Sequence, residues 1–206
     1  MKVLIINGSP RAKSNSKILI NELEKTFTSL GVESEVVDVA NLDVRGCMAC
    51  GYCHEHDGCV FKDIVNETSK KFETADGLIA VSPVYYASPN GQLISFLDRL
   101  FQSSRFPKKY KVGAAFVVAR RAGTTASFDV LNKYFTISGM PVVSGDYWNN
   151  GFGRLPGEIE NDEEGLRNAR VVAQRMTFLM KAIKDAKENY PELLEEEERK
   201  STHFMR

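Results

Sequence analysis

The chain has 206 residues, enough for one domain whose core needs no disulfide bridges in order to fold. Its 27 Lys and Arg balance 27 Asp and Glu, so no overall basic field favours nucleic acid or an anionic membrane as a partner. No apolar stretch approaches the ~20 residues of a membrane span, and the first residues lack the pattern of a secretory signal. We therefore expect a cytoplasmic protein with no nucleic-acid or membrane partner.

Short apolar runs alternate with longer amphipathic segments along the chain. The runs predict strands at 3–6, 35–39, 77–81, 112–118 and 141–144. Helical spacing predicts helices near 16–30, 63–73, 90–101, 125–138 and 163–187. This alternation predicts an α/β fold with a doubly wound, five-stranded parallel sheet and helices on both faces. Ligands of such sheets bind beyond the carboxyl ends of the strands, so the loops there are the candidate site.

The loop after the first predicted strand, NGSPRAKSNS, places hydroxyl, amide and cationic groups directly before a helix. Free backbone N–H groups and the helix dipole suit a phosphate at such a position. The loop has neither the G-x-G-x-x-G nor the Walker pattern, so a single phosphomonoester fits better than a dinucleotide or a nucleoside triphosphate. An ordinary capped turn is the alternative. The candidate anion-binding residues are Ser9, Arg11, Ser14, Asn15 and Ser16.

The loops after the third and fourth predicted strands carry the next candidates. The segment SPVYYASP is stiff and offers flat apolar surfaces that can pack along a planar ring. In the segment ARRAG, a glycine permits close backbone approach and an arginine can balance an anionic ligand. Local packing of the tyrosines and surface positions for the arginines are the alternatives. The candidates in these loops are Pro83, Val84, Tyr85, Tyr86, Ala119, Arg120 and Gly123.

All cysteines of the chain lie in one short run with the spacing C-x2-C-x2-C-x5-C. In a reducing compartment such a run is more often a set of ligands or redox groups than of structural bridges. An iron–sulfur cluster, a zinc ion and a metal-free redox-active thiol set all suit it, with His54 and His56 as possible zinc ligands. The candidate metal ligands are Cys47, Cys50, Cys53 and Cys59.

Taken together, the loops resemble those of the NAD(P)H-dependent FMN reductase family. The matching segments are GSPR-x2-SNS, SPVYY, GQLISFLDR and ARRAG, and the resemblance covers about residues 1–185. It implies a flavodoxin-like sheet of order 2-1-3-4-5 and bound FMN. The phosphate would lie on the residues from Ser9 to Ser16 named above. Those from Pro83 to Tyr86 would border the isoalloxazine, and 119–123 would close over its pyrimidine side.

The cysteine run is similar to the compact motif of the iron–sulfur flavoproteins within that family. This resemblance implies that the four cysteines bind a [4Fe–4S] cluster in the segment after the second strand, beside the flavin. We accordingly expect a flavodoxin-like FMN-binding domain over 1–187, with a Cys-rich insertion at about 43–62. A charged tail would follow over 188–206.

The function expected from this resemblance is an FMN-dependent oxidoreductase. Its donor would be the cosubstrate NAD(P)H or a ferredoxin, and its acceptor a quinone, a flavin, oxygen or a protein. Flavin chemistry is intrinsic to the cofactor, and no side chain stands out as a proton donor or acceptor. The resemblance also implies a homodimer or homotetramer. The alternatives are a flavodoxin-like electron carrier and a redox or metal sensor that uses the cysteine loop.

Overall fold

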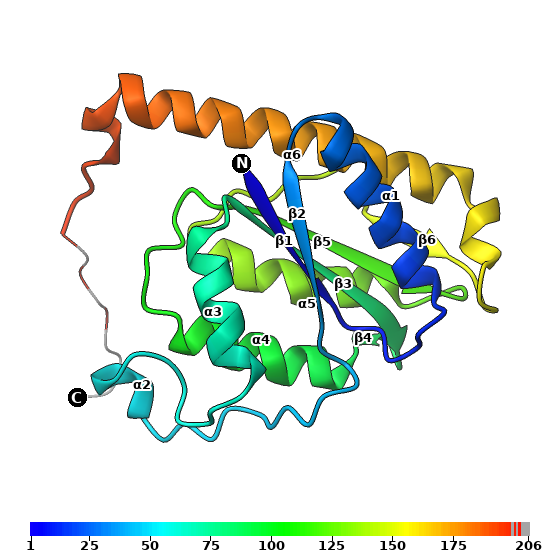
Figure 1. Cartoon of the computed structure of the whole chain (residues 1–206), viewed down its shortest axis with the longest axis horizontal. Helices are drawn as coiled ribbons and strands as arrows, with labels where there is room; N and C mark the ends of the chain where they lie inside the picture. Colours follow the sequence, from blue (N-terminus) through cyan, green and yellow to red (C-terminus); the bar gives the residue numbers. More distant parts are fainter. Residues whose placement is uncertain (199, 201, 203–206) are drawn as a thin grey trace.

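A twisted parallel sheet lies between two layers of helices in the computed structural model of the chain (Figure 1). The structure describes residues 1–198, 200 and 202. Residues 199, 201 and 203–206 of the predicted tail lie outside the described residues. The parallel strands are β1 (Lys2–Asn7), β2 (Glu33–Asp38), β3 (Gly77–Tyr85), β5 (Val112–Ala119) and β6 (Asn150–Phe152).

The sheet has the order β2-β1-β3-β5-β6, which is 2-1-3-4-5 when the parallel strands are counted alone. The predicted flavodoxin-like sheet is thereby confirmed. A two-residue strand, β4 (Ser88–Pro89), is an addition that pairs antiparallel with the end of β3. The strand order reverses between β1 and β3, since β2 is added on one side of β1 and β3 on the other, and ligands of such sheets usually bind at this point.

Helices cover both faces of the sheet because the central strands are apolar on both faces. One face is covered by α1 (Asn15–Ser29) and α6 (Glu163–Asn189), and the other by α3 (Ile64–Thr74), α4 (Gly91–Ser103) and α5 (Thr124–Ile137) (Figure 1). All eight residues of β5 are buried, and its alternate side chains enter the two cores. The short segments are α2 (Tyr52–Glu55) and the 3-10 turns η1 (Glu158–Asn161) and η2 (Pro191–Leu194).

Four of the long helices begin at a side chain that caps a free backbone N–H group. Ser14 accepts from Lys17 N at the start of α1, and Asp162 accepts from Gly165 N at the start of α6. Asp63 and Asn90 cap α3 and α4 in the same way. Among the described residues, no helix combines the length and the apolar character needed to cross a membrane.

The predicted fifth strand at 141–144 is wrong in its position. Only Val142 forms a bridge there, to Gly113, and regular pairing resumes at β6, where Asn150 lies opposite Val117. Between these points the edge strand is interrupted over residues 144–149. The apolar run at 141–143 marks where the edge strand first meets β5, but the regular pairing at the carboxyl end of the sheet begins only at β6.

A buried asparagine side chain replaces the missing backbone pairing in this interruption. Asn149 Nδ2 donates to Ala115 O (3.0 Å) and Val143 O (3.4 Å), and its Oδ1 accepts from Gly145 N (3.2 Å). Asn168 of α6 donates to the same Oδ1 (3.2 Å). An amide side chain with two donors and an acceptor can join strand, loop and helix in this way.

We expect Asn149→Ala to lower the free energy of unfolding by about 2–3 kcal/mol, because it leaves buried backbone groups unpaired. Chemical denaturation followed by far-UV circular dichroism measures this loss. Asn189→Ala is the control, since Asn189 is exposed and bonds only within its own helix turn. Its change should stay within about 0.5 kcal/mol. Equal losses in the two variants would contradict the role of Asn149.

Candidate functional site

A cavity of about 220 Å³ opens at the carboxyl ends of β1, β3, β5 and β6, and we call it the phosphate-loop cavity. It brings together loops that are far apart in sequence, as in the hydrogen bond from Asn15 Nδ2 to Leu155 O, which joins residues 140 positions apart. Ten of the twelve predicted cofactor residues line it, and Tyr86 and Gly123 do not. The lining residues are Ser9, Arg11, Lys13, Ser14, Asn15, Ser16, Pro83, Val84, Tyr85, Val118, Ala119, Arg120, Gly153, Arg154 and Pro156.

The first loop is held rigidly against the sheet. Gly8 N donates to Val81 O of β3 (2.8 Å), and Ser9 N donates to Asn7 Oδ1 (3.0 Å). A β-carbon on Gly8 would come within 2.8 Å of the Leu93 side chain, so only glycine lets the loop pass this close to α4. The loop therefore presents its groups from a fixed backbone.

The start of α1 supplies backbone donors to this cavity. Asn15 and Ser16 occupy the first two helical positions, where N–H groups have no partner within the helix. The Ser9 and Ser16 side chains are buried at the same place, while Arg11 is exposed at the rim. Hydroxyls, free N–H groups and a cation around one helix N-terminus form a site suited to a phosphate.

Asn15 has a different side-chain partner from the one predicted. Its Nδ2 donates to Leu155 O (3.0 Å), and its Oδ1 accepts from Gly157 N (3.0 Å) and Ile159 N (3.4 Å). The side chain thus fixes the segment that follows β6, and only the Asn15 backbone is left for an anion. Its predicted role at the phosphate remains a prediction in this narrower form.

The loop after β3 is a tight hairpin with an unusual backbone. Tyr86 and Ala87 both have positive φ, +50° and +58°, where glycine or asparagine is usual. This turn points the Tyr86 side chain fully into solvent, which is why Tyr86 does not line the cavity, while Tyr85 does. Gly123 lies behind the hairpin with φ +88°, and a β-carbon on it would come within 2.9 Å of Ala87 Cα.

The cavity residues that follow β6 were not predicted from the sequence. Gly153, Arg154 and Pro156 line the cavity, in a glycine- and proline-rich stretch that sequence reasoning could have identified as a loop. They were missed because the last strand is predicted at 141–144, whereas β6 begins at Asn150. Tyr147 and Trp148, which precede β6, are exposed and do not line the cavity. Lys13 and Val118 were also missed, although both adjoin predicted residues.

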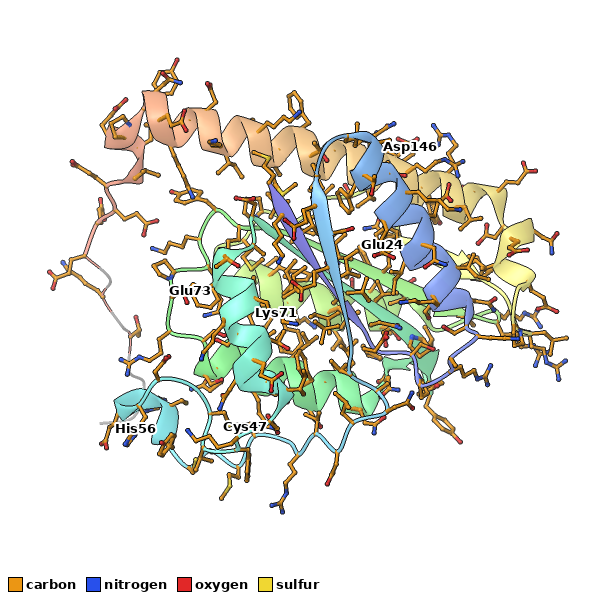
Figure 2. All side chains as sticks on the ribbon, viewed as in Figure 1. Glu24, Cys47, His56, Lys71, Glu73 and Asp146 are labelled. Carbon is orange, nitrogen blue, oxygen red and sulfur yellow. The ribbon has the colours of Figure 1, made fainter. Side chains whose placement is uncertain are left out.

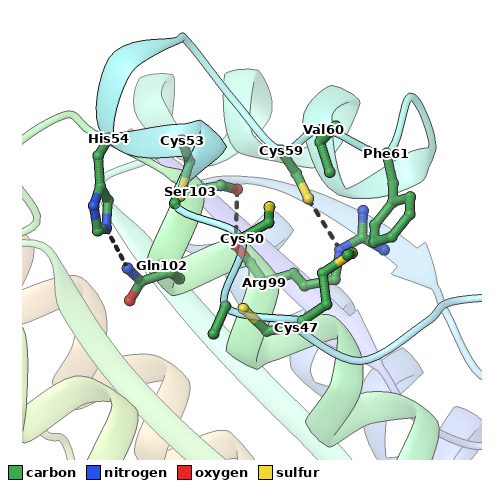
Figure 3. A pocket seen from close by; sticks show the side chains of 13 residues that line it. Cys47, Cys50, Cys53, His54, Cys59, Val60, Phe61, Arg99, Gln102 and Ser103 are labelled. Atoms are coloured by element: carbon green, nitrogen blue, oxygen red, sulfur yellow. Dashed lines mark hydrogen bonds between the residues drawn. The ribbon is translucent and has the colours of Figure 1, made fainter.

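A second cavity, of about 290 Å³, is lined by all four cysteines, and we call it the Cys cavity (Figure 3). All four are free thiols. Among the described residues, no three His, Cys, Asp or Glu side chains are close enough to hold one metal ion. His56 stacks on Tyr52 at 4.0 Å between ring centroids and does not line the cavity.

Four thiols around one cavity suit a cluster better than a single ion. A cubane cluster distributes its thiolate ligands over four iron atoms, so the sulfurs lie farther apart than around one zinc ion. Burial raises the pKa of the Cys53 thiol, and negative charge on Cys47, Cys59 and Cys50 raises it further. The thiols are therefore within electrostatic reach of one another, and a metal would favour their ionised forms.

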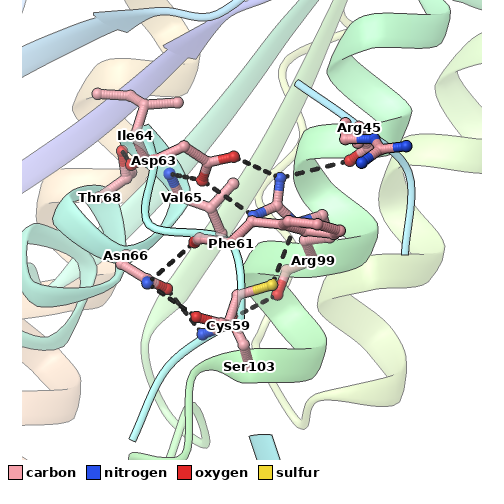
Figure 4. A network of polar contacts seen from close by, with 10 residues as sticks. All are labelled: Arg45, Cys59, Phe61, Asp63, Ile64, Val65, Asn66, Thr68, Arg99 and Ser103. Atoms are coloured by element: carbon pink, nitrogen blue, oxygen red, sulfur yellow. Dashed lines mark hydrogen bonds and ion pairs between the residues drawn. The ribbon is translucent and has the colours of Figure 1, made fainter. Parts of the chain in front are cut away.

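Cys59 is the most firmly positioned of the four cysteines (Figure 4). Its backbone N–H donates to Asn66 Oδ1 (2.7 Å), and its carbonyl accepts from Asn66 Nδ2 (3.0 Å). Arg99 Nε donates to its Sγ (3.3 Å). A β-carbon on Gly58 would lie 2.9 Å from Asn66 Oδ1, so this exchange of hydrogen bonds requires glycine there. Asn66 is a further residue of this site that was not predicted from the sequence.

The Cys cavity and the phosphate-loop cavity are distinct, and the predicted position of the cysteines beside the flavin stays a prediction. The two cavities share no lining residue. The loop after β2 runs along α4. Gln92 of this helix donates to Leu42 O, and Arg99 donates to Arg45 O. Just beyond the end of α4, Arg105 donates to His54 O. Arg99 lies about 12 Å along the helix axis from Gly91, the first residue of α4, at 1.5 Å per residue. Figure 2 shows Cys47 and His56 in this part of the molecule, apart from the sheet.

The fold and the phosphate-loop cavity define a flavodoxin-like protein. A flavodoxin from the domain Archaea has the same fold, with a TM-score of 0.59, 14% identity, and coverage of 88% of this chain and 99% of that one. The family model of NADPH-dependent FMN reductases matches residues 1–154, and the chain belongs to that family. The resemblance noted from its loops is confirmed.

The curated relatives include proteins that carry iron–sulfur names. An iron–sulfur flavoprotein of Methanocaldococcus jannaschii is 34% identical over 196 residues, which covers 89% of this chain and 100% of the relative. An iron–sulfur flavoprotein of Methanosarcina thermophila is 33% identical over 188 residues, which covers 89% of this chain and 97% of the relative. The similarity to the iron–sulfur flavoprotein branch is thus confirmed.

We expect Gly123→Ala to destabilise the protein by about 1–3 kcal/mol, because alanine at this positive φ is strained and meets the Ala87 backbone. Gly91→Ala is the matched control, since nothing lies within 4 Å of its added β-carbon. That variant should instead gain about 0.4–1 kcal/mol from a less flexible unfolded chain. Denaturant midpoints of both variants measure the difference, and equal midpoints would refute the packing of the 119–123 loop on the hairpin.

Proposed function

We propose that this protein is an FMN-dependent oxidoreductase that also carries a [4Fe–4S] cluster in the Cys cavity. The observation that carries the proposal is the phosphate-loop cavity. It combines buried hydroxyls, free helix N–H groups and a cationic rim at the strand ends, next to the flat surfaces of the loop after β3. Family membership supports a flavin as the ligand that needs these groups.

Each part of the cavity would have its own task in holding FMN. Ser9, Ser16 and the first N–H groups of α1 would bind the phosphate oxygens, and Arg11 would balance their charge. Val84 and Tyr85 would border the ring on the β3 side, and 119–120 on the β5 side. FMN held by these residues would supply the chemistry of accepting a hydride, two electrons and a proton, from a donor such as NAD(P)H and of releasing the electrons singly.

The cluster is proposed for Cys47, Cys50, Cys53 and Cys59. Three observations support it: the four thiols share one cavity, Cys59 is held in place by two helices, and relatives over nearly the whole chain are named iron–sulfur flavoproteins. A cluster supplies one-electron exchange, which complements a flavin that can split an electron pair.

The proposed donors are NAD(P)H or a ferredoxin, and the proposed acceptors are a quinone, a flavin, oxygen or a protein. Membership of the family of NADPH-dependent FMN reductases favours the nucleotide as donor. A homodimer or homotetramer is proposed as the working form. Exposed rings at Tyr86 and Trp148 offer apolar surface for contacts between copies.

The phosphate requirement can be measured by comparing FMN with riboflavin, which lacks the phosphate. The unchanged protein should bind FMN more tightly, and Arg11→Ala should reduce that preference by about 10–100-fold, the effect of a lost charge-assisted hydrogen bond. Lys25→Ala, at an exposed position farther along α1, should leave it unchanged. Fluorescence titration of the apoprotein gives both affinities. Failure to bind FMN at all would refute the proposed function.

The cluster can be tested by iron, sulfide and zinc analysis of protein purified without oxygen, together with its visible spectrum. We expect iron and sulfide in equal amounts, and their loss in Cys47→Ser. Met48→Leu is the control, because Met48 lines the same cavity without offering a thiol. Zinc without iron, or full iron in Cys47→Ser, would contradict the proposed site.

A further inference from the structure

Arg99 is a fully buried cation beside the Cys cavity, with 1% of its side chain exposed. Its guanidinium forms a two-pronged pair with Asp63, with Nη1 to Oδ2 at 2.7 Å and Nη2 to Oδ1 at 2.9 Å. Nη1 also donates to Arg45 O (3.4 Å), and the guanidinium lies 4.9 Å from the centre of the Phe61 ring. Such a fork fixes the direction of every N–H group.

The remaining direction of this fork points at a single cysteine. Nε donates to Cys59 Sγ at 3.3 Å, from a side chain that lines the Cys cavity itself. The Asp63 carboxylate offsets the positive charge on the opposite side of the guanidinium, so the sulfur faces an aligned N–H group of a neutralised pair. Cys47 and Cys50, by contrast, are exposed on the loop. The environment of the four thiols is therefore unequal.

Burial of the Arg99 guanidinium costs free energy unless the group has hydrogen-bond partners that carry the opposite charge. A guanidinium withdrawn from water is stable only when its N–H groups are bonded to acceptors. A neutral thiol is a weak acceptor, whereas a thiolate bound to metal is a strong one. Asp63 takes Nη1 and Nη2, and Cys59 Sγ is the acceptor of the Nε–H group.

We propose that Arg99 is a positioning residue that fixes Cys59 as the anchored ligand and raises the reduction potential of the cluster. This inference rests on the proposed function, since it requires a cluster in the Cys cavity. One-electron reduction by a low-potential donor adds one negative charge at the cavity. A hydrogen bond to a ligand sulfur stabilises that added charge and so favours the reduced state.

Redox titration of the cluster, followed by electron paramagnetic resonance, tests the proposal. Arg99→Gln should favour the oxidised state about tenfold, which for a one-electron couple is about 59 mV toward more negative potential. Arg99→Lys keeps the charge but cannot bond Asp63 and Cys59 in the same geometry, so its potential should lie between those of Arg99→Gln and the unchanged protein.

Asp63→Asn gives a second test with the opposite sign, which serves if the Arg99 variants fail to fold. Asparagine keeps the cap of α3 but removes the charge that offsets Arg99. The uncompensated guanidinium should then shift the potential to less negative values. Arg45→Gln is the matched control, because Arg45 is exposed and reaches the same Phe61 ring without touching a sulfur. Arg45→Gln should change the equilibrium between oxidised and reduced cluster by less than about threefold, since water and salt screen the Arg45 charge.

Iron content and far-UV circular dichroism accompany each potential. A folded Arg99→Gln protein that loses iron would support the anchoring role of Arg99. Iron content and potential equal to those of the unchanged protein would overturn the inference, as would a shift in Arg45→Gln as large as in Arg99→Gln. Absence of iron and sulfide from the unchanged protein would instead refute the proposed cluster, so the two failures are distinguishable.

Discussion

Burial of the central strands on both faces constrains every other part of this structure. β3 and β5 pack against helices on each side, so their side chains contribute to the two cores and leave little place for polar chemistry along the strands. Polar groups therefore collect where the strands end. The phosphate-loop cavity follows from this, because the loops after β1, β3, β5 and β6 meet at one edge of the sheet.

The Cys cavity follows a different rule, because it is built from a loop and two helices. The segment after β2 leaves the sheet and runs along α4, where Arg99 and Asn66 hold Cys59 from two sides. Its position depends on side-chain contacts with both α3 and α4.

How much the sequence reveals differs between these two regions for a physical reason. Apolar periodicity reports burial, so it predicts the parallel sheet and most of the helices, whereas the strand order is what the family resemblance implies. Loops directly after buried strands are also predictable, and ten of the twelve predicted cofactor residues meet at one cavity. A side chain that takes the place of backbone pairing leaves no periodic pattern in the sequence. The role of Asn149 and the late start of β6 could therefore not be predicted. The same holds for Arg99 and Asp63, which are 36 residues apart in sequence.

The interrupted edge has a consequence for how copies of this chain can associate. β6 is only three residues long, and the loop before it projects Tyr147 and Trp148 outward. At the opposite edge, Glu35 of β2 is paired with Lys2 and Lys71 at 2.6 and 2.7 Å. Short and charged edges give another chain no continuous row of backbone groups to extend. These edges disfavour association by extension of the sheet, so the proposed homodimer or homotetramer would form through helices and loops.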